Sequence, residues 1–244
     1  MKPKISIITV CYNSKNTIVR TMESVRSQNY GNVEYIVIDG DSTDGTKTII
    51  EDYRNKFCIP NQYISEPDLG IYNAMNKGIS LATGDLICML NSDDWLEDHA
   101  LEIVAQSYIP EQKYCVYYGL ERRIRDGKEE SVGFHGHEFL PEASLPHQAC
   151  YITRSCYEDL ALYNENYVSA ADYELLIKLY LSKKVTFMPI YSILANFTVG
   201  GMSAKAIGFT EEANIRYKWG LISRKKYIYL KFRVFFLKLI GTLK

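Results

Sequence analysis

Short apolar runs that stop abruptly at polar clusters constrain the fold of this chain more than any other feature. The first three runs span residues 5–11, 34–39 and 86–90. Runs of this length, bounded by turn residues, are typical of strands that are buried on both faces. The N-terminal part of the chain is therefore expected to build a sheet.

Helices are predicted to connect these strands. The chain after the first run shows apolar residues at helical spacing, and a second helix is expected from Thr46 onward. Strands that alternate with helices indicate an α/β fold with a mostly parallel sheet flanked by helices. Ligands of such sheets bind beyond the carboxyl ends of the strands. The polar clusters at 12–14, 39–45 and 91–94 should therefore converge on one crevice.

Two adjacent carboxylates, Asp93 and Asp94, follow the third run. Neighbouring carboxylates repel each other unless solvent or a cation compensates their charge. Mg2+ or Mn2+ suits such oxygen ligands and keeps coordination places open for water and phosphate. Alternatively, the acids cap a helix that starts near Trp95. The pair by itself leaves both interpretations open.

Two further segments are expected to line the crevice. The glycine-rich turn 39–45 is neither a dinucleotide fingerprint nor a P-loop. It is either a plain turn with a helix cap, or a site where Asp39 accepts hydrogen bonds from a base or ribose. A loop and helix at 65–79 carry the polar side chains of Asp68, Asn76 and Lys77. Lys77 could oppose a diphosphate, although a lone lysine is more often a solvated surface residue.

Four stretches resemble, in this order, family 2 glycosyltransferases with the GT-A fold: residues 9–13, 39–46, 66–78 and 91–94. The chain is similar in particular to bacterial enzymes of exopolysaccharide, capsule or O-antigen assembly. The resemblance covers roughly residues 3–200. The order and spacing of the four motifs make it specific, since any one of them alone would be weak.

The resemblance implies a nucleotide-diphosphate-sugar donor, often UDP-linked, and a divalent cation, Mn2+ or Mg2+. Asp93 and Asp94 match the D-x-D-type motif of the family, with Asp94 favoured as the direct metal ligand. The positions that match those holding the nucleoside are Val10, Tyr12, Asn13 and Asp39. Many members have a second acid where this chain has Gly40, so Asp39 or Asp41 would have to make the base contact of that acid.

The second half of the chain is expected to face the acceptor. Asp172 matches the catalytic base of the family, although Ala171 replaces the preceding glutamate, and Glu174 is the reserve candidate. A sugar hydroxyl needs such a base, and a base opposite the leaving diphosphate implies inversion at the anomeric carbon. Asp172 could instead be a first-turn acid favoured by the helix dipole. His147 either faces the donor or acceptor sugar, or is a polar residue at the entry of a strand.

Two other loops carry weaker assignments. His135 and His137 are expected to be loop histidines, because too few other ligand candidates surround them for a metal site. The stretch 196–203 resembles a Gly-Gly-x-Ser segment of related enzymes. It is expected to be a flexible loop, and it could serve as a lid over the donor.

The C-terminal residues 213–244 differ in charge from the rest of the chain. They contain nine Lys or Arg and no Asp or Glu, which leaves 19 basic and 29 acidic residues in the expected glycosyltransferase domain, 1–212. Basic and aromatic residues interleaved on a helix suit an anionic membrane surface. Nucleic acid is a rival partner that would leave the carboxylate crevice unexplained. The segment could also pack on the body of the protein or form an oligomer contact. Membrane contact is preferred, because polymer-building transferases often act on polyprenyl-diphosphate acceptors.

The sequence also indicates where the protein works. The apolar run after Lys4 is too short for a signal peptide, and an uninterrupted apolar window of ~18 residues is lacking, so a spanning helix is not expected. Six scattered cysteines without a C-x-x-C pair favour buried free thiols in a reducing cytosol. These features predict a cytoplasmic protein that is peripheral on the inner face of the plasma membrane.

The prediction from the sequence is therefore a metal-dependent, inverting glycosyltransferase. It would move a sugar from a nucleotide-diphosphate donor, UDP-linked in the first instance, to a lipid-linked or saccharide acceptor in cell-surface polysaccharide assembly. The alternative is a non-catalytic nucleotide-sugar-binding or scaffold subunit, conceivable because the second acid and the glutamate are missing. A nucleotidyltransferase would usually carry a glycine-rich basic loop near its start, and residues 12–15 do not supply one.

Overall fold

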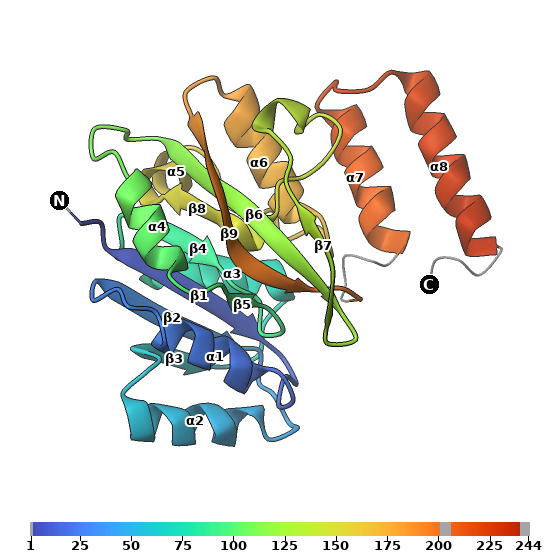
Figure 1. The fold of residues 1–244 in the computed structure, drawn as a ribbon. Coiled ribbons are helices and arrows are strands. Elements are labelled where there is room, and N and C mark those ends of the chain that lie inside the picture. Colours follow the sequence, from blue (N-terminus) through green and yellow to red (C-terminus); the bar gives the residue numbers. More distant parts are fainter. Residues whose placement is uncertain (1, 201–205, 240–244) are drawn as a thin grey trace.

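The computed structural model describes residues 2–200 and 206–239 of the chain. Its centre is a mixed sheet of nine strands in the order β3-β2-β1-β4-β8-β6-β9-β5, with β7 paired to β6 (Figure 1). The strands are β1 Ile5–Cys11, β2 Val33–Asp39, β3 Gln62–Ser65, β4 Leu86–Met89, β5 Trp95–Leu96, β6 Cys115–Arg125, β7 Lys128–Gly133, β8 Cys150–Thr153 and β9 Thr186–Thr198. The predicted α/β fold is confirmed.

The two halves of the sheet differ in strand direction. Strands β3, β2, β1 and β4 run parallel, so their carboxyl ends meet at one edge. Strand β8 then pairs antiparallel with both β4 and β6, and β9 runs parallel to β6. The parallel half is the part whose connecting helices were predicted from the alternation of apolar runs and helical segments.

Helices cover both faces of the sheet (Figure 1). Helices α1 (Ile18–Arg26), α2 (Thr46–Phe57) and α4 (Ala100–Ser107) bury apolar side chains on one face. On the other face lie α3 (Ile71–Leu81), α5 (Arg154–Asp159) and α6 (Ala171–Leu181). Strand residues alternate between the two cores, as the period of two in a strand requires.

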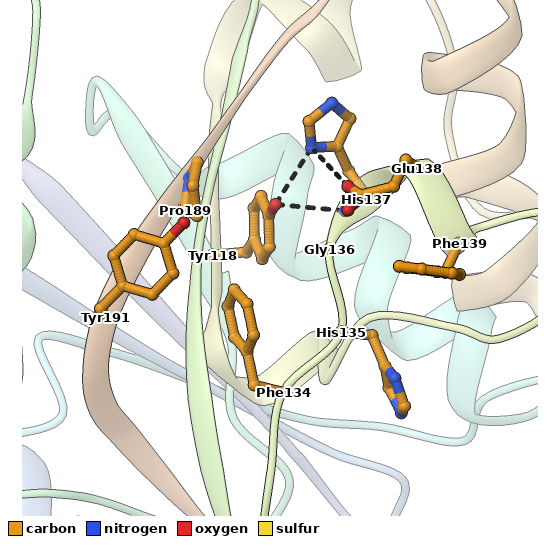
Figure 2. A pocket seen from close by; sticks show the side chains of 9 residues that line it. All are labelled: Tyr118, Phe134, His135, Gly136, His137, Glu138, Phe139, Pro189 and Tyr191. Atoms are coloured by element: carbon orange, nitrogen blue, oxygen red, sulfur yellow. Dashed lines mark hydrogen bonds and ion pairs between the residues drawn. The ribbon is translucent and has the colours of Figure 1, made fainter.

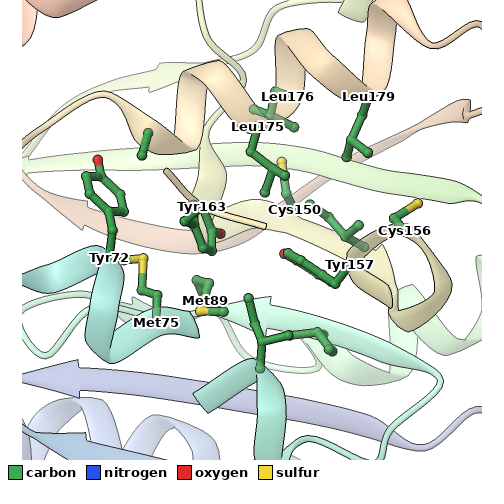
Figure 3. Close-up of a cluster of buried hydrophobic side chains, with 14 of the residues drawn as sticks. Tyr72, Met75, Met89, Cys150, Cys156, Tyr157, Tyr163, Leu175, Leu176 and Leu179 are labelled. Carbon is green, nitrogen blue, oxygen red and sulfur yellow. The ribbon is translucent and has the colours of Figure 1, made fainter. Parts of the chain in front are cut away.

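The core beneath α3, α5 and α6 is rich in aromatic side chains (Figure 3). Tyr72 from α3 stacks on Tyr163, with ring centroids 5.7 Å apart, and Tyr157 packs against the same ring. Leu175 and Leu176 of α6 close this cluster from above the sheet. The packing fixes α3 and α6 relative to each other, which matters for the site described below.

The chain after Asp94 differs from the prediction. A helix was expected to start near Trp95, but residues 95–96 form β5, which pairs antiparallel with β9, and α4 begins only at Ala100. The reason is that β9 extends to Thr198 and so passes beside residues 95–96. Residues 196–198 of the predicted flexible loop therefore belong to a strand, and residues 201–203 of that loop lie outside the described residues.

Two further helices follow β9, namely α7 (Ala206–Lys218) and α8 (Arg224–Leu239). The domain boundary expected after residue 212 falls inside α7. The Glu211 carboxylate accepts hydrogen bonds from the backbone N–H groups just before α6, so α7 is tied to the body. Helix α8 lies beside α7 at the end of the molecule (Figure 1). Among the helices described, none combines the length and the apolar character needed to cross a bilayer.

The remaining short elements connect β7 to β8. They are the 3-10 turns η1 (His137–Phe139) and η2 (His147–Ala149). The six cysteines form no disulfide: Cys58 is exposed and the other five are buried. A turn at 126–127 joins β6 and β7, and Asp126 and Gly127 adopt positive φ angles of 51° and 75° in it.

Candidate active site

The three polar clusters after β1, β2 and β4 meet at one edge of the sheet. The Asn13 N–H donates to Ser42 Oγ over 2.8 Å, which joins the first cluster to the second. Ser14 Oγ lies 2.8 Å from Ser92 Oγ, which joins the first cluster to the third. The predicted convergence of these segments is confirmed, and it follows from the parallel order of the strands.

Asp39, at the carboxyl end of β2, is buried and holds the following turn. One carboxylate oxygen accepts hydrogen bonds from Ser42 Oγ and, at 3.5 Å, from Cys11 Sγ. The other accepts from the Ser42 N–H at 3.0 Å and from Ser65 Oγ at 2.6 Å. Burial, and then the charge of Asp39, raises the pKa of the Cys11 thiol, which therefore stays protonated. Asp39 shapes the turn from inside the fold.

The exposed side of the same turn is formed by other residues. Tyr12 is 63% exposed at the end of β1 and lies next to Gly40. Asp68 enters from the loop before α3, and its Oδ2 lies against Gly40. Asn13 caps the turn by accepting from the Thr43 N–H at 2.9 Å, and Asp41 pairs with Lys47.

Three other predicted donor-site residues have structural contacts. Val10 points into the core beneath α3. Asn76 donates to the Tyr163 carbonyl at 3.0 Å and to Glu165 Oε1 at 2.8 Å, and so ties α3 to the loop before α6. Lys77 forms an ion pair with Glu66 at 2.7 Å. Asn76 and Lys77 thus tie α3 to the loops around it, while Val10 is part of the core.

Asp93 and Asp94 form a tightly held acidic pair after β4. Asp94 Oδ1 accepts from the Thr198 N–H at 2.8 Å, and Oδ2 accepts from Gln148 Nε2 at 3.0 Å. Burial and then the charge of Asp93 raise the pKa of Asp94, and burial raises that of Asp93. Arg20 donates to the Asp93 carbonyl at 2.8 Å. The pair is desolvated and mutually repulsive, which is the condition that a cation relieves.

The donor set fits a hard divalent ion. Within the described chain, no group of three or more His, Cys, Asp or Glu side chains is arranged to hold a metal. The protein thus offers two carboxylates, Asp93 and Asp94. Mg2+ is commonly bound through one or two carboxylates, with waters and substrate phosphates completing its shell. Oxygen ligands also suit Mn2+.

Asp172 lies in the first turn of α6, as predicted, and faces two polar side chains. The Tyr72 hydroxyl donates to Asp172 Oδ1 at 3.1 Å. His147 Nδ1 lies 3.7 Å from Asp172 Oδ2, and His147 Nε2 is buried without a partner in the described residues. Met89, at the end of β4, lines the same small cavity as His147 and Asp172. The carboxylate is therefore oriented from both sides, next to the strand that leads to the acidic pair.

Glu174, the reserve candidate for the base, is fully buried and turned toward the C-terminal helices. Its Oε1 accepts from Lys218 Nζ at 2.7 Å and from Trp219 Nε1 at 3.3 Å. Lys178 Nζ lies 3.1 Å from Oε2. Burial alone would raise the pKa of Glu174, but the hydrogen bonds from the two lysines lower it to about 2. Glu174 is a structural anion that attaches the end of α7 to α6.

Comparison with known proteins identifies the family. The model of glycosyl transferase family 2 matches residues 6–170, about two thirds of the chain. The match contains the turn after β2, the acidic pair and His147. The chain belongs to glycosyl transferase family 2. It is thus a nucleotide-sugar glycosyltransferase, and Asp172 lies just beyond the matched residues.

Individual relatives agree with this family. The chain is 32% identical over 182 residues to an uncharacterised glycosyltransferase of Mycobacterium tuberculosis, covering 72% of this chain and 68% of the relative. It is 30% identical over 238 residues to a chondroitin synthase of Escherichia coli, covering 93% of this chain but only 34% of that synthase. The chain spans about a third of that synthase.

Solved structures show the same GT-A fold. The S. aureus TarS structure in complex with UDP-GlcNAc superposes with a TM-score of 0.69 at 20% identity, covering 93% of this chain and 70% of TarS. The mannosyltransferase PcManGT from Pyrobaculum calidifontis, in complex with GDP-Man and Mn2+, also gives 0.69, at 15% identity, covering 96% of this chain and 70% of PcManGT.

Several side chains that contact the predicted site residues were not singled out from the sequence. They are Tyr72, Gln148, Thr198 and Arg20, which contact Asp172, Asp93 or Asp94. The tyrosine is separated from its aspartate by 100 residues, so no local pattern could have paired them. The presence of the tyrosine in the 66–78 motif was the only signal.

A pocket of about 440 Å³ lies between β6, β9 and η1 of the transferase (Figure 2). Its walls are aromatic: Phe134 lies parallel to Tyr118 and next to the exposed Tyr191. His137 Nδ1 lies 3.0 Å from the Tyr118 hydroxyl, and the ring stacks on Phe187. The contacts of His137 are those of a loop histidine that shapes a pocket.

Proposed function

We propose that this family 2 enzyme is a metal-dependent, inverting glycosyltransferase of cell-surface polysaccharide assembly. The donor is a nucleotide-diphosphate sugar, in the first instance a UDP-sugar, and the acceptor is lipid-linked or a saccharide. The proposal is supported by the link between the buried acidic pair and the oriented carboxylate of Asp172: Gln148 donates to Asp94, and the adjacent His147 lies 3.7 Å from Asp172. The names of related proteins, a chondroitin synthase and a TarS complex with UDP-GlcNAc, support the donor and acceptor classes.

In this proposal Asp93 and Asp94 hold the divalent cation. When bound, the cation neutralises charge on the donor diphosphate as it leaves. Thr198 and Gln148 keep the Asp94 carboxylate in place, since each donates to one of its oxygens. Outer partners of this kind fix the orientation of metal ligands.

Asp172 is proposed to be the catalytic base. Tyr72 donates to its Oδ1, which leaves Oδ2 to take the proton of the acceptor hydroxyl as that oxygen attacks. His147, 3.7 Å from Oδ2, limits the rotation of the carboxylate and lines the same cavity. A single base on the side opposite the departing diphosphate gives in-line displacement, and hence inversion at the anomeric carbon.

The C-terminal helix α8 is proposed to bring the enzyme to an anionic membrane surface on the cytoplasmic side. Its sequence contains six Lys or Arg and no Asp or Glu. The rings of Tyr229, Phe232, Phe235 and Phe236 are exposed. Basic residues attract anionic headgroups, and aromatic rings are stable in the headgroup layer. Such a location would serve a lipid-linked acceptor.

The test is release of nucleoside diphosphate from a panel of nucleotide sugars with Mn2+ or Mg2+. We expect slow, metal-dependent release from one donor, which is lost in Asp94→Ala and in Asp172→Asn. Asp126→Asn, in the exposed β6–β7 turn, is the matched control and should behave as the unmodified protein. Donor binding without turnover on any acceptor would favour a binding subunit. The proposal would be overturned if no nucleoside diphosphate were released and calorimetry detected no donor binding.

A further inference from the structure

We infer that Asp68 reads the nucleobase of the donor, and that it selects a base with a ring N–H, such as uracil or guanine, over cytosine and adenine. The inference rests on the proposed function, because it concerns the nucleotide of the same site. It differs from the expectation that Asp39 or Asp41 replaces the acid that is missing at Gly40.

Both of those acids already have partners within the chain. Asp39 is fully buried, and both of its oxygens already accept hydrogen bonds from the turn and from Ser65. Asp41 is turned to Lys47, with which it forms an ion pair on the surface of α2. Asp39 is therefore shielded from a nucleobase above the turn, and the charge of Asp41 is already paired with that of Lys47.

The carboxylate of Asp68, from the loop before α3, fills the space next to Gly40. A Cβ atom added to Gly40 would lie 2.5 Å from Asp68 Oδ2, so the carboxylate occupies the space that a side chain at position 40 would take. Asp68 Oδ1 accepts from the Gly70 N–H at 2.9 Å, which fixes the rotamer. Within residues 2–200 and 206–239, no hydrogen bond reaches Oδ2. The missing acid of β2 is thus replaced in space by an acid from the β3–α3 loop.

An aromatic wall stands next to this carboxylate. The Tyr12 ring lies 3.5 Å from the same Cβ position at Gly40, and the side chain is 63% exposed. Every base has a π face that can stack on such a ring. Stacking on Tyr12 would bring the edge of the base toward Asp68.

The hydrogen-bonding capacity of a carboxylate decides which nucleobases can bind to it. An ionised carboxylate is an acceptor only. Uracil N3 and guanine N1 carry a hydrogen, so they can donate to Oδ2, and hydrogen bonds to a charged group are the stronger kind. The corresponding ring nitrogens of cytosine and adenine present lone pairs, which repel the carboxylate. The geometry therefore favours UDP- or GDP-linked donors and disfavours CDP- and ADP-linked ones.

Calorimetric titration of the full chain with UDP, GDP, CDP and ADP, each with Mn2+, tests this selection. We expect UDP or GDP to bind about tenfold or more tightly than CDP and ADP, which is the difference that one hydrogen bond to a charged group supplies. Equal binding of UDP and CDP would overturn the inference while leaving the transferase intact. Binding of none of the four would instead count against the proposed function.

The Asp68→Asn variant distinguishes base reading from a purely structural role. The amide can keep the Gly70 contact and can donate to cytosine N3. We therefore expect the affinity ratio of UDP or GDP to CDP to fall about tenfold, through weaker UDP or GDP binding and tighter CDP binding. Asp126→Asn should leave the ratio unchanged. A ratio that moves in Asp41→Asn but not in Asp68→Asn would overturn the inference.

Moving the acid back to β2 is a second test. Gly40 has no positive φ angle, so its backbone accepts a side chain. Gly40→Asp alone should weaken UDP binding, because the new carboxylate overlaps Asp68. The second substitution, Asp68→Ser, clears the space and keeps an acceptor for the Gly70 N–H. The double variant should regain the preference for UDP or GDP over CDP to within about threefold, because the carboxylate at position 40 would make the same contact with the base. Failure of the double variant to regain any preference, in a folded protein, would contradict the spatial replacement.

Discussion

The Tyr72 hydroxyl donates a hydrogen bond to Asp172 Oδ1 across 3.1 Å, and so joins α3 to the first turn of α6. Burial, and then the charge of Asp172, raises the pKa of Tyr72, so the phenol stays protonated and acts as a donor. The tyrosine belongs to the 66–78 motif on the donor side. The proposed base is thus held by a side chain from the donor half of the site, which couples the two halves geometrically.

Replacing Tyr72 by phenylalanine should slow turnover with little effect on donor binding. Without the hydroxyl the Asp172 carboxylate can rotate, and a misplaced catalytic group costs about ten- to a hundredfold in rate. We expect kcat to fall by about tenfold while the KM for the donor is unchanged. Initial rates at saturating donor measure this.

A matched control exists for that variant. Tyr114 donates to Asp159 at 3.0 Å on the exposed surface, so Tyr114→Phe removes a similar tyrosine–aspartate hydrogen bond away from the crevice. It should keep the full rate. Equal rates for both variants and the unmodified enzyme would show that Tyr72 does not orient the base.

Replacing Gln148 by leucine should weaken metal binding. Gln148 is buried and donates to Asp94 Oδ2 at 3.0 Å, so the substitution frees the carboxylate to turn away from the cation. Loss of such an outer partner typically lowers metal affinity by about 10- to 100-fold. A Mn2+ titration of donor turnover should show a half-saturating concentration raised by this factor, with nearly full rate at high Mn2+. An unchanged titration curve would exclude this role for Gln148.

The raised pKa values of Asp93 and Asp94 predict how metal affinity depends on pH. Because burial and the charge of Asp93 raise the pKa of Asp94, the metal-free pair retains a proton at higher pH than an ordinary carboxylate would. The cation must displace that proton. Apparent Mn2+ affinity should therefore weaken as the pH is lowered below neutrality and strengthen as it rises. Isothermal titration at several pH values, with proton release followed in buffers of different ionisation heat, checks the sign.

The sequence predicted correctly those features that are determined by residues close together in the chain. The three apolar runs became β1, β2 and β4, and the clusters behind them met in one crevice, because parallel order follows from alternation with helices. Asp172 at the start of α6 was also placed correctly by its position before an apolar stripe. These features depend on residues that are close together in the chain.

The sequence was misleading where distant segments decide the outcome. Trp95 and Leu96 form a strand only because β9 passes beside them, a hundred residues further along. Asp39 lies at a strand end, as expected, but its hydrogen-bond partners, the hydroxyls of Ser42 and of Ser65 on another strand, were not predicted. Glu174 is bound by Lys218, which belongs to the C-terminal region that was expected to be separate. Burial and long-range pairing cannot be read from the local pattern.

The ionised Glu174 should contribute to stability in a pH-dependent way. Its pKa is lowered from the ordinary value to about 2, so its contribution is present above the unfolded pKa and is lost as the pH falls toward 2. Glu174→Gln should reduce the free energy of unfolding by about 1–3 kcal/mol at pH 7, and the difference should fall to roughly half of that near pH 3 and vanish only below the folded pKa. Urea unfolding at both pH values measures it. Glu158→Gln, which removes an exposed pair with Arg154, should have almost no effect.

Reversing the charge of α8 should release the enzyme from anionic vesicles. Helix α8 is held to α7 by the stacked rings of Tyr227 and Tyr217, whose centroids are 4.5 Å apart, so its lysines are on the outside of a helical pair. The set Lys225→Glu, Lys226→Glu and Lys231→Glu should weaken binding to phosphatidylglycerol vesicles by about a hundredfold, at about 1 kcal/mol for each basic residue lost near the surface. Co-sedimentation measures the affinity.

The control must separate a specific surface from bulk charge. Glutamates at Lys56, Lys128 and Lys184, all exposed on the body, give the same change in net charge away from α8. These substitutions should leave vesicle binding nearly intact, because charges beyond the screening length of about 8 Å contribute little at physiological salt. Binding of the unmodified protein should also weaken with salt and should fail on neutral vesicles. If vesicle binding weakens equally in both triple variants, then net charge, and not the surface of α8, accounts for the attraction. The exposed aromatic rings of α8 would then need another partner.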